Sequence, residues 1–201
     1  MNSIIENSLE NSFSYQEYRS HVTQLAKENK TTGHEQREDL IHYTQLNETR
    51  LNRLDKTIQI TDEVNSFLKN LKKEYIWLVI SESWCGDAAQ ILPIMNKMAI
   101  ASGKINLRIV LRDDNEDLMN QFLTNGTKSI PKLIIIDKET NSVITDFGPR
   151  PKAAKQLILD YKAAHGSIDE TAKIELQKWY LNDKGISTQK EIVDLMQDFK
   201  S

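Results

Sequence analysis

At residues 83–88 the chain reads Ser-Trp-Cys-Gly-Asp-Ala, shortly after the run Tyr-Ile-Trp-Leu-Val-Ile-Ser at 75–81. Aromatic and β-branched residues in a run of this length predict a strand. A helical pattern begins at Asp87 and extends to Ser102. Cys85 is therefore expected at a junction between a strand and a helix, with its sulfur facing the unpaired amides of the helix N-terminus.

Strands and helices alternate on the C-terminal side of this junction. Helices within the connections imply parallel strand pairs, whereas a five-residue turn at 138–142 implies an antiparallel hairpin. The chain is therefore predicted to be an α/β protein with a mixed sheet. After the first strand and helix, the expected order is a strand at 105–111, a helix at 115–123, strands at 132–137 and 143–147, and a helix at 152–164.

Helical patterns precede this region. Ser14 and Glu17 form a capping box ahead of a first helix, and a long one-sided helix is expected from Glu35 to about residue 57. Thr61 then opens a short helix. We expect residues 1–57 to form an N-terminal helical extension of the main domain.

Helical patterns also follow the main domain, which is expected at residues 58–165. Two capping boxes, Ser167 with Glu170 and Thr188 with Glu191, predict two helices in a C-terminal extension at 166–201. The apolar residues of the long N-terminal helix allow the extensions to cover a groove or to form a homodimer contact.

Composition excludes several classes of function. The 201 residues carry a net charge of -3, and acidic and basic residues are mixed along the chain. We therefore expect no nucleic-acid partner. The most apolar run, at 75–80, is too short to cross a membrane, and the first residues lack the features of a signal peptide. A cytoplasmic protein with no membrane partner is expected.

Cys85 is the single cysteine, so an intramolecular disulfide is excluded. A helix N-terminus lowers the pKa of a cysteine, whereas the neighbouring carboxylate of Asp87 raises it. These opposing effects predict a thiol of moderate reactivity. The alternative interpretation is that Cys85 is a small buried apolar residue.

Three features together resemble the thioredoxin superfamily. They are the stretch from Trp84 to Ala88, Pro93 within the next helix, and Ile130-Pro131 before a strand. Their spacing is similar to that of the W-C-G-x-C motif, the helix-kinking proline and the cis-proline of that family. The resemblance covers about residues 60–165, and the flanks resemble a bacterial branch with helical extensions. It implies a thioredoxin-like three-layer α/β/α fold with a central sheet of about four strands.

Two departures from the family pattern narrow the implied function. Ala88 stands at the position of the second cysteine, and Val79 at that of a buried aspartate. The resemblance therefore implies a monothiol protein, in which an outside thiol would release any mixed disulfide formed on Cys85. This would be a thiol-disulfide oxidoreductase or a redox-responsive protein in cell redox homeostasis. Its substrate would be a protein or a low-molecular-weight thiol or disulfide, with no cofactor.

The same motifs allow two other functions. A non-catalytic module would bind a protein or peptide in the same groove without electron transfer. The C-G-x-small pattern from Cys85 to Ala88 also resembles monothiol glutaredoxins, which handle glutathione or an iron-sulfur cluster, but Asp87 departs from that family's aromatic residue and makes this the weakest alternative.

The resemblance assigns residues to a site. Cys85 would be the catalytic residue, and the substrate would be bound by Trp84, Gly86, Asp87, Ile130 and Pro131. A cis bond at Pro131 would turn the backbone of Ile130 toward the cysteine, where it could pair with an extended substrate.

Basic residues and possible metal ligands give weaker indications of a functional site. Arg50, Arg53 and Arg150 could approach the thiol and stabilise a thiolate, but a solvated helix face or pairing with a carboxylate is the better explanation of these residues. His34, Glu38 and His42 share a helical face, but such a charged face is usually solvated, so we propose no metal.

Overall fold

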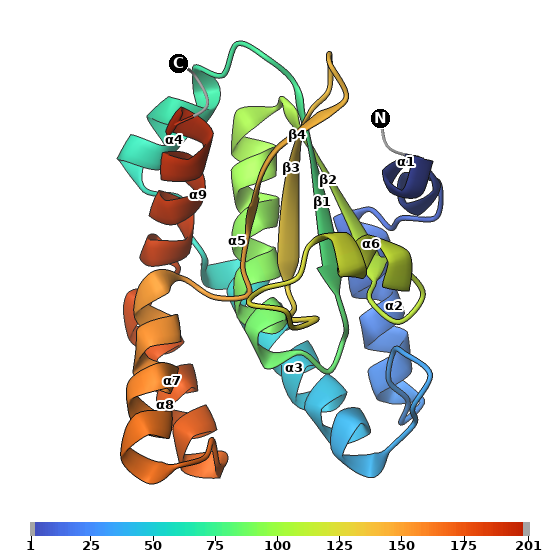
Figure 1. The fold of residues 1–201 in the computed structure, drawn as a ribbon, viewed down its shortest axis with the longest axis vertical. Coiled ribbons are helices and arrows are strands. Elements are labelled where there is room, and N and C mark those ends of the chain that lie inside the picture. The colour runs from blue at the N-terminus through green and yellow to red at the C-terminus, as the bar shows by residue number, and fades with distance from the viewer. Residues whose placement is uncertain (1–2, 199–201) are drawn as a thin grey trace.

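A four-stranded mixed sheet forms the centre of the structure, a computed structural model that describes residues 3–198 (Figure 1). The strand order is β2-β1-β3-β4. The pair β1–β2 is parallel, and the pairs β1–β3 and β3–β4 are antiparallel, which confirms the predicted mixed sheet. The strands are β1 (Tyr75–Ser81), β2 (Ile105–Leu111), β3 (Lys132–Asp137) and β4 (Ser142–Phe147).

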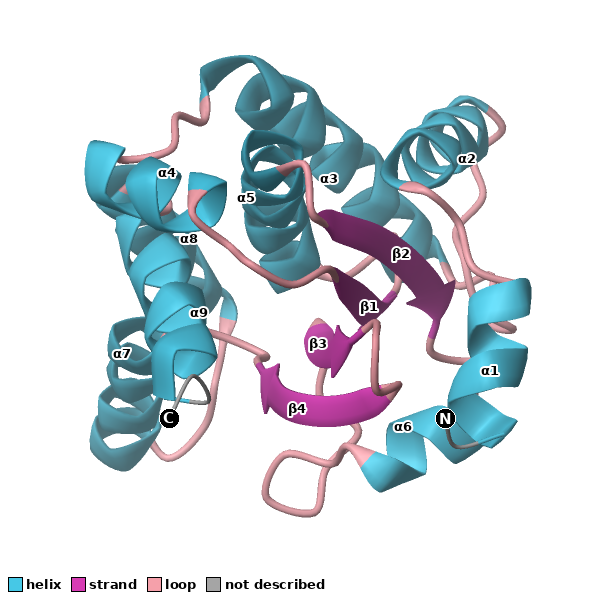
Figure 2. Cartoon of the chain, turned by 90° about the horizontal axis from the view of Figure 1, so that it is seen from above, coloured by secondary structure: helices cyan, strands magenta, loops and turns pink. Residues whose placement is uncertain are grey.

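Helices cover both faces of the sheet and complete the three-layer α/β/α fold (Figure 2). The helices α5 (Gly86–Ser102) and α9 (Ile186–Asp198) lie on one face, and α1 (Ser3–Glu10) and α6 (Glu116–Gln121) on the other. The remaining helices are α2 (Tyr15–Lys27), α3 (Glu38–Thr57), α4 (Asp62–Lys69), α7 (Lys152–His165) and α8 (Glu170–Asp183). No helix in residues 3–198 is long and apolar enough to span a membrane.

The central strand β1 is buried on both of its faces. The side chains from Trp77 to Ile80 are fully inaccessible to solvent. Because helices cover both sides of the sheet, this strand has a continuous apolar sequence instead of an alternating one. The strand ends at the loop that carries Cys85.

The N-terminal helices share the core of the sheet. Tyr18 of α2 and Leu51 of α3 belong to the same buried cluster as β1. Phe13 and Ile109 exchange two backbone hydrogen bonds of 2.8 Å, so the chain before α2 covers the edge of β2. The division into extensions at 1–57 and 166–201 and a domain at 58–165 remains a proposal.

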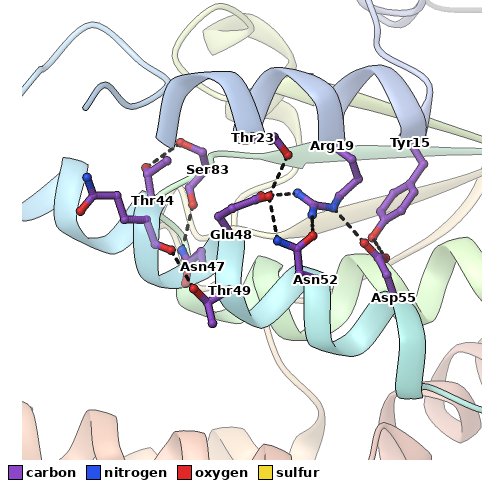
Figure 3. Close-up of polar contacts among 11 residues, drawn as sticks. Tyr15, Arg19, Thr23, Thr44, Asn47, Glu48, Thr49, Asn52, Asp55 and Ser83 are labelled. Carbon is purple, nitrogen blue, oxygen red and sulfur yellow. Dashed lines mark hydrogen bonds and ion pairs between the residues drawn. The ribbon is translucent and has the colours of Figure 1, made fainter. Parts of the chain in front are cut away.

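Polar contacts join α2 to α3 (Figure 3). The guanidinium of Arg19 donates hydrogen bonds to Glu48 at 2.6 Å, Asp55 at 3.0 Å and Asn52 at 2.9 Å. The Tyr15 hydroxyl also donates to Asp55, at 2.5 Å. Arginine can bond several partners at once because its planar guanidinium group donates in several fixed directions.

The helix starts were predicted correctly at one end of the chain and wrongly at the other. The capping box of Ser14 and Glu17 is present. At the C-terminal end, Asp169 instead of Ser167 caps α8, through a 3.0 Å bond from the Ala172 amide. The helix α9 begins at Ile186, so Thr188 lies inside it and caps nothing. Asp169 also bonds the hydroxyl of Tyr161 in α7, a tertiary contact that sequence spacing does not show.

We expect Arg19→Met to lower the free energy of unfolding by about 2 kcal/mol, because it leaves the carboxylates of Glu48 and Asp55 without their cation. Urea denaturation followed by circular dichroism measures this change. The matched control is Arg37→Met, because Arg37 also pairs with two carboxylates but its side chain is 61% exposed, against 11% for Arg19. It should shift stability by less than about 0.5 kcal/mol. Equal losses of unfolding free energy in both variants would contradict a larger contribution from the buried Arg19 pairs.

Candidate functional site

A groove of about 840 Å³ opens in front of Cys85. Near the sheet, the groove is lined by residues 84–87, Ile130 and the segment 149–150. The helix α3 lines one side with Tyr43, Leu46 and Arg50 among others, and α8 contributes residues such as Ile174 and Gln177. Helices α3 and α8, which lie before and after the strands in the sequence, therefore help to build the groove.

Most of the residues predicted for the site come together here. Trp84, Cys85, Gly86, Asp87 and Ile130 all line the groove.

Pro131 is buried behind Ile130 and does not line the groove. The Ile130-Pro131 bond is cis, as the resemblance implied, and Gly148-Pro149 is a second cis bond that was not predicted. Gly148 has a φ of +126° and packs against the carbonyl oxygen of Pro131, so a side chain has no room there.

Cys85 caps the N-terminus of α5 as a buried thiol. Its sulfur accepts a 3.5 Å hydrogen bond from the Ala88 amide, and its S–H donates to the Ile130 carbonyl oxygen at 3.3 Å. Burial, followed by the charge of Asp87, raises the pKa of Cys85 to about 12. The helix amides and Arg150 lower this pKa, as expected, but burial outweighs them. At neutral pH the group is a thiol.

The carboxylate of Asp87 is held by two side chains that arrive from other elements. The Tyr180 hydroxyl of α8 donates to it at 2.8 Å, and Arg150 Nε donates at 2.7 Å. Arg150 therefore lies near the thiol but is paired with a carboxylate. Because both contacts stabilise the charged carboxylate, the negative charge beside Cys85 is maintained. Tyr180 had no sequence signal for this role.

Ser83 anchors the cysteine loop to the N-terminal segment. Its amide donates to the Thr32 hydroxyl at 2.8 Å, and its own hydroxyl accepts from the Thr32 amide at 3.0 Å. The hydroxyls of Thr44 and Ser83 lie 2.8 Å apart, and Asn47 Nδ2 donates to the Ser83 carbonyl at 2.8 Å (Figure 3). Because these partners are 36 to 51 residues away in sequence, local patterns could not reveal them.

The groove also contains a cation stacked on an aromatic ring. The Arg112 guanidinium lies 4.9 Å from the centroid of Trp84 and pairs with Asp113 at 2.8 Å. Such stacking holds the indole in place at the edge of the groove.

No group of three or more His, Cys, Asp and Glu side chains in the described part of the chain is arranged to hold a metal ion. His34 contacts the Asp113 carbonyl oxygen at 3.1 Å.

The sheet order, the cysteine between β1 and α5 and the cis-proline before β3 define a protein of the thioredoxin fold. Residues 33–166 match the sequence profile of a family described as thioredoxin. This match covers more than half of the chain, and the chain therefore belongs to the thioredoxin family.

Two solved structures share this fold. A protein of unknown function from Pseudomonas aeruginosa is 17% identical, with a TM-score of 0.61 over 92% of this chain and 98% of that one. An HIV epitope scaffold is 20% identical, with a TM-score of 0.57 over 92% of this chain and 99% of that one. At these identities the likeness shows the fold alone. No curated protein matches the sequence.

We expect alkylation of Cys85 by iodoacetamide to be slow at pH 7.5 and to accelerate without a plateau up to about pH 10, because its pKa is about 12. Asp87→Asn should lower this pKa and speed alkylation, because it removes a negative charge and frees Arg150 to face the sulfur. Cys85→Ser provides the blank. A wild-type midpoint below about 8.5 would contradict the assignment of a buried thiol.

A second titration prediction concerns Glu82, which is fully buried and accepts a 2.9 Å bond from the Asp113 amide. Burial raises the pKa of this carboxyl. A raised folded pKa means that stability is fully present below the unfolded pKa and falls as pH rises through the folded one. Glu82→Gln should therefore remove part of the stability that wild type loses as the pH rises above the ordinary glutamate pKa of about 4.5.

Urea denaturation at several pH values measures this effect, with Glu63→Gln as the control at an exposed position. The difference in stability between Glu82→Gln and wild type should grow in favour of the variant as pH rises. A difference that does not change with pH would contradict a raised pKa.

Proposed function

We propose that this chain is a non-catalytic binding module of the thioredoxin family, whose groove takes an extended polypeptide segment. The observation that carries the proposal is the buried sulfur of Cys85, which donates to the Ile130 carbonyl oxygen in the lining of an open groove. A thiol with a pKa of about 12 is a poor nucleophile at neutral pH, because the thiolate is the reactive form. The groove itself remains available for binding.

The backbone of Ile130 supports binding of an extended chain. Ile130 lines the groove, and no hydrogen bond within residues 3–198 engages its amide N–H. A peptide carbonyl can accept from this amide, as in the addition of a short strand. Recognition through the backbone explains how a segment could be held without a covalent step.

Exposed apolar side chains supply a second contact. Leu46 of α3 and Ile174 and Leu181 of α8 are large apolar residues that line the groove and remain exposed. Their burial by a bound segment would be favourable. Clustered apolar exposure of this kind is typical of a surface that contacts a partner.

The second candidate is a monothiol thiol-disulfide oxidoreductase or redox-responsive protein in the cytoplasm. It is favoured by the place of Cys85 in the groove and at the N-terminus of α5. Its thiolate would attack a disulfide of a protein or a small molecule, form a mixed disulfide and expel the other sulfur as a thiolate. With Ala88 in place of a second cysteine, an outside thiol would complete the exchange.

We also place the chain in the bacterial branch of the thioredoxin family that has the W-C-G-D-A motif and helical extensions.

Selection of octapeptides from a random phage-displayed library tests the proposal. Wild type and Cys85→Ala should enrich the same peptides and bind them with affinities within about twofold. Ile174→Ser should weaken binding about fivefold, because it removes apolar contact area. The control Ile100→Ser changes an isoleucine that is 65% exposed, against 54% for Ile174, and lies outside the groove, so it should leave affinity unchanged.

Two outcomes would overturn the binding module. One is that no peptide is enriched. The other is that folded Cys85→Ala loses binding while wild type forms mixed disulfides at Cys85, which would favour the oxidoreductase.

A further inference from the structure

The groove is positively charged although the whole chain is acidic. Seven lysine and arginine side chains line it, against the two carboxylates Asp87 and Glu170. The full chain has a net charge of -3. The excess of cations is therefore a local property of this surface, and it favours an anionic ligand.

Three of the seven cations have no carboxylate partner. Four are paired, with Asp87, Asp113, Glu116 and Glu170 as their acceptors. Within the described residues, no ion pair is formed by the remaining cations, which are Arg50, Arg53 and Lys178. The groove thus carries positive charge that the protein itself leaves unneutralised.

Arg50 is fixed in place and partly desolvated. Its Nη1 donates to Asn47 Oδ1 at 2.8 Å, and Asn47 is in turn bonded to the Ser83 carbonyl. Burial is the main cause of a lowered pKa at Arg50; Arg53, one turn later on α3, lowers it further, whereas Tyr43 and Asp87 raise it. A partly desolvated guanidinium without a carboxylate partner is unfavourable, and an anion beside Arg50 would offset this cost.

Two side-chain hydrogen-bond donors, from Arg50 and Gln177, lie close to Gly86. A Cβ atom on Gly86 would lie 3.4 Å from Arg50 Nη1 and 3.6 Å from Gln177 Nε2. Gln177 Oε1 already accepts from Gln90 at 2.7 Å, so its Nε2 is the group left to donate toward the groove. Side-chain donors from α3 and α8 therefore meet above the first turn of α5, whose dipole also favours an anion.

We infer that the segment bound in this groove is acidic, and that an Asp or Glu carboxylate of the partner peptide binds between Arg50 and Gln177, with Arg53 beside them. This inference rests on the proposed binding function. The exposed apolar residues Leu46, Ile174 and Leu181 lie along the same groove, so the matching segment combines acidic with apolar side chains. Arginine suits this role because its fork matches a carboxylate.

The peptides selected from the random library test the inference through their composition. Enrichment of Asp and Glu among them is the expected result. One selected peptide and its Glu→Gln counterpart are then labelled with fluorescein, and their affinities are measured by fluorescence polarisation. The acidic peptide should bind at least about tenfold more tightly. Its affinity should fall as NaCl rises from about 50 to 300 mM.

Variants of the chain assign the effect to Arg50. Arg50→Gln should weaken binding of the acidic peptide about tenfold and leave the Glu→Gln peptide unaffected. Lys56→Gln removes the same charge from an exposed position of α3 outside the groove and should change neither affinity. If Arg50→Gln does not fold, Arg50→Lys keeps the charge but loses the fork, and it should still bind the acidic peptide several-fold more weakly than wild type.

The outcomes separate this inference from the function on which it rests. Enrichment of neutral or basic peptides, or an unchanged affinity in Arg50→Gln, would overturn the acidic specificity and leave the binding module intact. The absence of any enriched peptide would overturn both.

Discussion

The hydrogen bonds of Ser83 are the constraint on which the site depends. This residue follows β1 by two positions and precedes Cys85 by two, and its hydroxyl and backbone are bonded to the segment at 31–47. Buried hydroxyl and amide groups need such partners, so the loop and the N-terminal helices fix each other's position. Through Asn47 the same bonds place Arg50 at the groove.

A balance between burial and helix electrostatics determines the state of Cys85. The N-terminus of α5 favours a thiolate, but the sulfur is buried and the Asp87 carboxylate, which accepts from Tyr180 and Arg150, lies nearby. Desolvation is the larger effect. Arg50 and Arg53 line the same groove as the sulfur and form no ion pair within the described residues. The surface is therefore better suited to holding an anionic group than to forming a bond with sulfur.

The sequence predicted the parts of the fold that depend on local patterns. The runs of β-branched residues located β1, β2 and β3 at their observed bounds, and the resemblance implied the cis bond at Pro131. The parts that depend on tertiary contacts were missed. Asp169 caps α8 and bonds α7, whereas the sequence pointed to Ser167. Tyr180 and Gln177 reach the site from a distant helix, and no spacing rule relates them to Cys85.

The ionisation of Cys85 distinguishes a binding module from an oxidoreductase, and the ¹³Cβ chemical shift of Cys85 reports this ionisation without a chemical probe. The measurement is made on protein labelled with ¹³C at cysteine, from about pH 6 to pH 9.5, in a buffer that contains oxidised glutathione. We expect the shift of a free thiol throughout, because burial keeps the sulfur protonated and prevents disulfide exchange. A transition to the thiolate shift near neutral pH, or a new signal at a disulfide shift, would contradict it and restore the oxidoreductase as the leading function.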